Sequence, residues 1–112
     1  MTTTPKTLLQ GKYIENAETT QYTAPAGFRT IIDKATVNNA TAAPVTLVLQ
    51  IVPNGAAADA IYVVKSFTVG AGRSDLLAEL VGHILNPGDF ISTLAGTSSA
   101  LTIRLSGREV SI

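Results

Sequence analysis

The feature that most constrains the fold of this chain is a tight turn between two apolar runs at residues 81–92. The segment reads Val-Gly-His-Ile-Leu-Asn-Pro-Gly-Asp-Phe-Ile-Ser. Pro87 holds φ near about −65°, which suits the second position of a turn, and Gly88 can take the positive φ that a type II turn needs at its third position. The segment predicts strand, turn and strand. Residues 22–28 repeat the arrangement around Pro25 and Gly27, which indicates a compact all-β domain.

Alternation of apolar and polar residues predicts about eight short strands in one domain spanning residues 1–112. Residues 45–52 are the strongest case, and because both faces of this strand are largely apolar, we expect it to lie centrally in its sheet. Further strands are expected at residues 6–15, 19–23, 28–38, 60–69, 89–95 and 101–112. The pattern is typical of a single-domain antiparallel β-sandwich of jelly-roll type.

Two strands carry residues that conflict with simple alternation. In residues 28–38, Asp33 falls on the same face as Ile31, Ala35 and Val37, and a β-bulge or a one-sided edge would resolve that conflict. Lys65 breaks the inward row of its own strand.

Three other segments are irregular. Gly107 predicts a bulge in the last strand. Residues 74–81 fit a helix, or a short strand followed by an irregular crossing, and the all-β surroundings favour the strand. Residues 1–5 are polar and rich in Thr, and we expect a flexible N-terminal arm there.

Composition narrows the classes of function. Charged residues make up 14% of the chain, against roughly 25% in typical soluble domains, and such a weakly charged surface suits a protein that works in a packed assembly. The net charge is zero and Lys and Arg are scattered, which disfavours nucleic acid as a partner. With no Cys, disulfides and thiolate metal sites are excluded. No signal peptide or membrane-spanning run is evident, so we expect a soluble protein made in the cytoplasm.

The chain offers little for catalysis. His83 is the single histidine, it has no neighbouring acid or nucleophile motif, and one His cannot build a common zinc site. The candidate carboxylates are spread over separate segments, whereas a glycosidase needs two of them across a cleft. These carboxylates are Asp33, Asp59, Asp75, Glu79 and Asp89. Asp89 is expected to bond its local backbone, and Asp33 could pair with Lys34.

Two short motifs also fail to indicate a site. Residues 70–72 read Gly-Ala-Gly after a strand, but the third glycine and the long helix of a dinucleotide site are missing. Residues 39–41 match a glycosylation sequon, which has no consequence without secretion. We therefore predict no enzymatic activity and no catalytic, cofactor-binding or metal-ligating residue.

Several turn and strand motifs nevertheless resemble those of small virion proteins of tailed bacteriophages. They are a Thr-Ala-Pro-Ala-Gly corner at residues 23–27, a strand ending in Asn38-Asn39, the Leu-Asn-Pro-Gly-Asp turn at residues 85–89 and a closing Leu-Thr-Ile-Arg strand at residues 101–104. The likeness covers residues 19–109. Size and lack of Cys make the chain most similar to the capsid decoration, or cement, proteins of short-tailed phages.

The resemblance implies a non-enzymatic jelly-roll or β-sandwich module on the outer capsid surface of a virion. Its expected partners are the major capsid protein and further copies of itself, as a homodimer or alternatively a trimer, with residues 1–10 available as an arm. Two-fold symmetry would let one dimer bridge two shell subunits. A tail- or fibre-associated attachment module is the alternative. A jelly-roll enzyme or ligand binder is disfavoured, because one His is too few for a cupin-like metal site.

Overall fold

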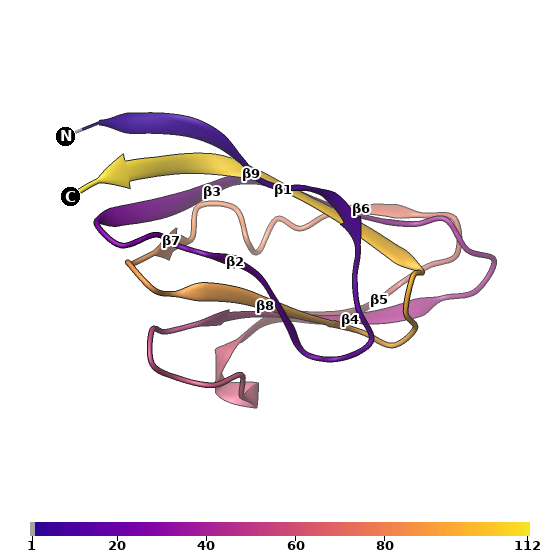
Figure 1. The fold of residues 1–112 in the computed structure, drawn as a ribbon. Coiled ribbons are helices and arrows are strands. Elements are labelled where there is room, and N and C mark those ends of the chain that lie inside the picture. The colour runs from indigo at the N-terminus through magenta and orange to yellow at the C-terminus, as the bar shows by residue number, and fades with distance from the viewer. Residues whose placement is uncertain (1) are drawn as a thin grey trace.

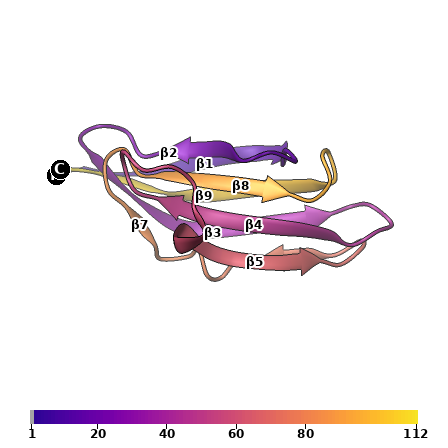
Figure 2. The same cartoon turned by 90° about the horizontal axis from the view of Figure 1, so that it is seen from below.

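The computed structural model describes residues 2–112 and shows two antiparallel sheets packed face to face (Figure 1). The first sheet contains, in spatial order, β1 (Thr3–Tyr13), β9 (Leu101–Ser111), β3 (Phe28–Asn39) and β6 (Ser74–Leu76), with β7 (Ile84–Leu85) also pairing with β3. The second sheet contains β2 (Thr19–Thr23), β8 (Phe90–Ala95), β4 (Val45–Val52) and β5 (Val63–Val69), in the order that Figure 2 shows. In residues 2–112, no helix is long and apolar enough to cross a membrane.

The pairing of the strands is that of a jelly roll. Strand β1 pairs with β9, β2 with β8, β3 with β6 and β7, and β4 with β5. The chain therefore runs as one long nested hairpin that is wrapped into two sheets. The predicted all-β jelly-roll sandwich is confirmed. The structure has nine strands rather than about eight because residues 77–83 interrupt one strand position and divide it into β6 and β7.

The hydrophobic core fills the space between the two sheets. Its largest fully buried side chains come from both sheets, from the interrupting turn and from the residue that follows β1. They are Ile14, Ile32, Val37, Leu47, Leu49, Leu77, Leu80, Leu85, Ile91, Leu101, Ile103 and Leu105. The burial of each such side chain contributes about 1.5–3 kcal/mol to the free energy of folding. A strand that slipped by one residue would expose these side chains, so their burial stabilises the observed register. The short strand and irregular crossing favoured for residues 74–81 are confirmed, and Leu77 and Leu80 of the crossing close the edge of the core.

The bulge expected around Asp33 is present. The register of β3 against β9 shifts between Ile32 and Lys34, so Asp33 leaves the ladder and the strand changes parity. Consequently Ile32 is fully buried together with Ala35 and Val37, whereas Ile31 is only half-buried. Placing Ile31 on the same face as Ala35 and Val37 was therefore wrong, because the bulge exchanges the faces of the residues before it.

Gly107 lies opposite this bulge but does not itself form one. Burial along β9 alternates regularly through Gly107 to Glu109, and the register shifts lie on the neighbouring strands β1 and β3. The prediction of a bulge at Gly107 was therefore misplaced. Glycine is needed there because an ideal Cβ would lie 2.2 Å from the carbonyl oxygen of Ile31. Only hydrogen fits where the bulged strand approaches.

The N-terminal segment is a strand rather than an arm. Thr3, Thr4 and Pro5 belong to β1 and pair with Val110, Glu109 and Arg108 of β9. The flexible arm expected at residues 1–5 is therefore wrong for residues 3–5, while Met1 lies outside the described residues. Pairing supplies hydrogen bonds that the edge of β9 would otherwise leave to water.

Strand β5 begins later than predicted. Residues Ala60–Tyr62 form a short 3-10 helix, η1, and β5 starts only at Val63. The side chain of Asp59 caps η1 by accepting a hydrogen bond from the Ile61 backbone N–H at 3.1 Å. The Asp59 carboxylate binds a backbone N–H group that a β-strand would otherwise use for its ladder. Residues 60–62 therefore form a helical turn although their side chains favour a strand.

Candidate functional site

The two Pro-Gly corners that stand out in the sequence meet at one end of the sandwich. The Ala24 N–H donates to the Asp89 carbonyl, and the Gly88 N–H donates to the Ala24 carbonyl, both at 2.9 Å. Gly27 and Gly88 have φ of 81° and 85°. In the second corner the Asp89 N–H donates to the Asn86 carbonyl at 2.9 Å, as the predicted type II turn requires.

This end of the molecule is occupied by structural bonds rather than by reactive groups. The carboxylate of Asp89 accepts hydrogen bonds from the backbone N–H groups of Asn54 and Asn86, each at 2.9 Å. It is therefore a turn residue, as predicted. His83 is exposed and enters the fold through its backbone, whose carbonyl accepts from the Ile32 N–H at 3.2 Å.

All eight carboxylates of the chain are held by intramolecular partners. Glu15 pairs with Lys12, Asp33 with Arg108, Asp75 and Glu79 with Lys65, and Glu109 with Lys6; Glu18 accepts from Gln50 and Ser92, Asp59 from Ile61, and Asp89 from Asn54 and Asn86. Asp33 thus bonds Arg108, not Lys34 as considered from the sequence. Within residues 2–112 no group of three or more His, Asp or Glu could hold a metal ion.

The two remaining sequence motifs are also structural. Asn39 is fully buried, and its side-chain Nδ2 donates to the carbonyls of Ala43 and Val69 at 2.9 and 3.0 Å. The sequon asparagine therefore ties a turn to β5. At residues 70–72 the chain makes a tight reversal in which the Arg73 N–H donates to the Gly70 carbonyl at 3.1 Å.

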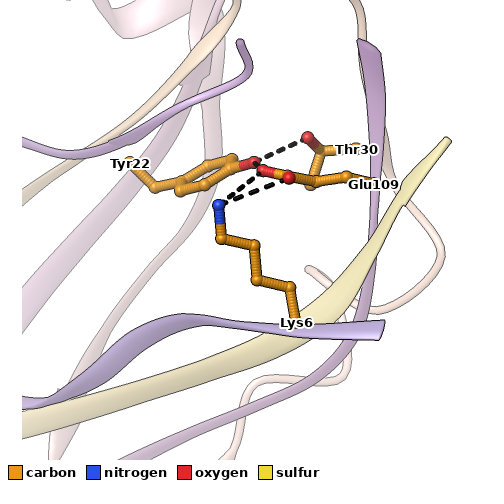
Figure 3. Close-up of polar contacts among 4 residues, drawn as sticks. All are labelled: Lys6, Tyr22, Thr30 and Glu109. Carbon is orange, nitrogen blue, oxygen red and sulfur yellow. Dashed lines mark hydrogen bonds and ion pairs between the residues drawn. The ribbon is translucent and has the colours of Figure 1, made fainter. Parts of the chain in front are cut away.

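A polar cluster joins the two sheets at their β1–β2 side (Figure 3). The hydroxyl of Tyr22 in the second sheet donates to Oε2 of Glu109 at 2.5 Å and lies 2.8 Å from Oγ1 of Thr30, both in the first sheet. The Lys6 ammonium lies 3.3 Å from both carboxylate oxygens of Glu109. Thr30 is fully buried and the Glu109 side chain is 9% exposed, so these groups depend on one another for their hydrogen bonds.

The electrostatics of this cluster keep the phenol protonated. Burial raises the pKa of Tyr22, and the Glu109 carboxylate raises it further because a second negative charge beside the first is unfavourable. Tyr22 therefore serves as a neutral donor that clamps one sheet to the other. Sequence reasoning missed the cluster because Tyr22 and Glu109 are 87 positions apart. The sequence did contain one indication of the cluster: Glu109 follows Ile103 and Leu105 at even spacing along the last strand, so alternation places its side chain on the same inward face.

A second clamp lies where β5 faces β6. Lys65 donates to Asp75 at 3.3 Å and to Glu79 at 3.2 Å, and its ammonium lies 4.3 Å from the centroid of the Phe67 ring. Burial opposes the charge on Lys65, but the two carboxylates outweigh it and hold the pKa of Lys65 above its usual value. Lys65, which interrupts the apolar inward-facing residues of its strand, thus bridges the two sheets at their edge.

Between these clamps, the outer face of the second sheet carries one charged side chain, that of Glu18, whose carboxylate accepts hydrogen bonds from Gln50 and Ser92. Strands β2, β4 and β8 contain no Asp, Glu, Lys or Arg, and the single charged residue of β5, Lys65, lies between the sheets. The part of this outer face beyond Glu18 is here called the uncharged face, and its strand residues are the exposed Thr46, Ser66 and Thr68 and the half-buried Val48 and Leu94.

Comparisons with known proteins agree with the fold. A scan of protein-family models and a search of curated proteins each found no match for this chain. Among solved structures, the chain is similar to a chain of the disulfide-linked pili that form Bacillus endospore appendages, with a TM-score of 0.57 and 16% sequence identity. The similarity covers 99% of this chain and 89% of the pilus chain. At this identity the likeness shows a shared fold.

Proposed function

We propose that this protein is a non-enzymatic structural protein that decorates the outer surface of a bacteriophage capsid and cements adjacent major capsid protein subunits. The virion assignment follows from the resemblance of its turn motifs to phage decoration proteins. The observation that carries a structural role is the uncharged face on the outer side of β4, β5 and β8. Burying such a face against a partner avoids the cost of desolvating charges, which are depleted from the cores of protein interfaces.

The sandwich behind this face is well suited to bear load. Tyr22 and Lys65 clamp the two sheets at opposite sides, and all eight carboxylates are committed to internal bonds. The molecule measures 46 × 26 × 19 Å, so its sheet faces are its broad surfaces. A homodimer with two-fold symmetry presents two copies of the binding face and bridges two capsid subunits. A trimer would serve the same role at a three-fold position.

A second candidate is a tail- or fibre-associated module that acts through self-assembly or attachment. The likeness to a pilus chain favours it, because that protein has a similar fold within a filament. The pili are described as disulfide-linked, whereas this chain contains no Cys. Any filament built from it would therefore lack disulfide links.

Binding to capsids assembled without this protein tests the proposal. We expect purified protein to cosediment with such capsids and to raise the temperature at which they release DNA. Thr68→Glu places a charge on the uncharged face and should weaken binding at least about tenfold, since a buried unpaired charge costs more than 1.4 kcal/mol. Thr7→Glu is the matched control, because Thr7 is also an exposed threonine of an edge strand but belongs to the first sheet.

Two results would contradict this function. One is the absence of cosedimentation by a folded protein at concentrations well above those of the capsid subunits. The other is equal binding by the Thr68→Glu and Thr7→Glu variants, which would remove the uncharged face from the interface. Concentration-dependent filaments of the purified protein would favour the second candidate instead.

A further inference from the structure

The first sheet carries an apolar groove on its outer side, at the place where its edge strand is interrupted. Leu76 ends β6, Val81 lies in the interrupting turn and Ile84 begins β7; their side chains are 65%, 46% and 57% exposed. These are three of the six large hydrophobic side chains that are exposed within residues 2–112. Such a concentration of exposed apolar area on one edge is typical of a binding surface.

The groove follows from the way the interruption divides its apolar residues. Leu77 and Leu80 turn inward and are fully buried, so the residues on either side of them must face outward. The resulting groove has a volume of about 420 Å³ and is lined by Asp33, Lys34, Ala35, Leu76, Ala78 and Val81.

Two cations without partners lie beside this groove. Lys34 and Arg104 are exposed and form no ion pair or side-chain hydrogen bond with any residue in 2–112. Across the β3–β9 ladder Lys34 is opposite Ser106 and Thr36 is opposite Arg104, and these four side chains line a second hollow of about 240 Å³. Lys34 lines both hollows, so apolar and cationic parts form one continuous surface.

The nearest carboxylate does not neutralise these cations. Asp33 also lines the groove, but Arg108 holds it with Nε 3.0 Å from Oδ2 and Nη2 3.0 Å from Oδ1. A bidentate pair of this kind leaves little of the Asp33 charge for a neighbour. The surface therefore keeps an excess of positive charge from Lys34 and Arg104, next to exposed Leu76 and Val81.

We propose that this groove, with Lys34 and Arg104 at its side, is the docking surface for a segment of another protein in which an apolar side chain is flanked by carboxylates. The charge complementarity of the surface selects this occupant. A second copy of this chain is a poorer match, because each of its eight side-chain carboxylates already accepts an intramolecular hydrogen bond or ion pair. The groove lies on the sheet opposite the uncharged face, so this inference does not depend on capsid binding.

The test is a titration of the isotope-labelled protein with two synthetic peptides, followed by heteronuclear NMR. The first is acetyl-Glu-Leu-Leu-Glu-amide and the second is its neutral analogue, acetyl-Gln-Leu-Leu-Gln-amide. We expect the acidic peptide to shift the amide signals of residues 34–36, 76–81 and 104–106, and to bind more weakly as salt is added. Lys34→Gln and Arg104→Gln should each weaken it by about 1.5- to 5-fold, the effect of one exposed ion pair.

Two matched controls separate this site from general stickiness. Arg73→Gln removes another exposed arginine that lies outside the groove, and Ile61→Ser removes an apolar side chain that is 77% exposed on η1. Neither should change binding, whereas Leu76→Ser should weaken it. The proposal is overturned if the neutral peptide binds equally well or if the shifts lie elsewhere. It is also overturned if inorganic phosphate shifts the same signals with equal affinity and Leu76→Ser has no effect, since the cations would then form a simple anion site.

Discussion

Tyr22→Phe provides a direct test of the clamp that joins the two sheets. The change keeps the ring and its burial but removes the hydroxyl that donates to Glu109 at 2.5 Å and contacts Thr30 at 2.8 Å. A hydrogen bond to a charged group contributes about 1.5–3 kcal/mol, and leaving a buried polar partner unsatisfied adds to the loss. Because Thr30 is fully buried, we expect the free energy of unfolding to fall by about 2–3 kcal/mol.

Thermal and urea unfolding followed by circular dichroism measure this loss. At about 2.1 cal/mol/K per residue, a chain of 112 residues has an unfolding entropy of about 0.24 kcal/mol/K, so Tm should fall by about 8–12 °C. Tyr13→Phe is the matched control, because that side chain is 58% exposed and its hydroxyl has no hydrogen-bond partner within residues 2–112. It should change stability by less than about 0.5 kcal/mol.

The same variant has a pH signature that a packing defect lacks. The pKa of Tyr22 is raised in the folded protein above its ordinary value of 10.0, so its contribution to stability is complete below about pH 10 and is lost as pH rises further. Above pH 10 the stability difference between wild type and Tyr22→Phe should therefore shrink, by at most about 1.4 kcal/mol per pH unit.

The reasoning would be refuted by a Tyr22→Phe protein whose Tm equals that of Tyr13→Phe. It would be equally damaged by a double-mutant cycle in which Tyr22→Phe and Glu109→Gln add without coupling, because bonded neighbours normally couple by about 0.5–3 kcal/mol. A coupling energy within that range would assign the loss to the Tyr22–Glu109 bond itself.

Three further substitutions test other parts of the fold. Gly107→Ala should destabilise the protein by about 1–3 kcal/mol or more in urea unfolding, since its Cβ would lie 2.2 Å from a backbone oxygen; an unchanged midpoint would show that β3 can move. Gly88→Val should cost at least about 2 kcal/mol, because φ is +85° and the new Cβ would lie 2.4 Å from the Asn54 side chain. Capsid binding per folded molecule should persist in Gly88→Val, and its selective loss would return this turn to the functional surface. Lys65→Met should cost about 1 kcal/mol through loss of its two ion pairs, measured by thermal unfolding at low and high salt; equal losses in both would contradict an electrostatic role.

Local signals were sufficient for much of the secondary structure. The bounds of β2 and β4 were predicted as the structure has them, at residues 19–23 and 45–52, because period-two alternation of β-branched residues between turn residues has few other solutions. The turn at Gly88 was predictable for a similar reason, since Pro87 and Gly88 restrict the backbone within four residues. The conflict at Asp33 predicted either a bulge or a one-sided edge, and the structure has the bulge.

Local reasoning failed where a distant strand decides the outcome. Residues 3–5 are polar, and the sequence around them gives no sign of a pairing partner. In the structure they pair with residues 108–110 of β9, and this pairing orders them. Gly107 reads as a bulge, although its glycine is required by a bulge in the strand beside it. The start of β5 was also missed, because a side-chain cap at Asp59 competed with the strand preference of the three residues that follow it.

The sequence by itself therefore determined the class of fold and the turns, since these depend on composition and on neighbours within a few residues. Only the tertiary structure decided which charges are paired and which stay available. Tyr22 meets Glu109 from 87 positions away, and Arg108 takes Asp33 from 75 positions away, leaving Lys34 without its sequence neighbour as a partner. The physical reason is that jelly-roll wrapping pairs early strands with late ones, so the surface that partners can recognise is assembled from both ends of the chain.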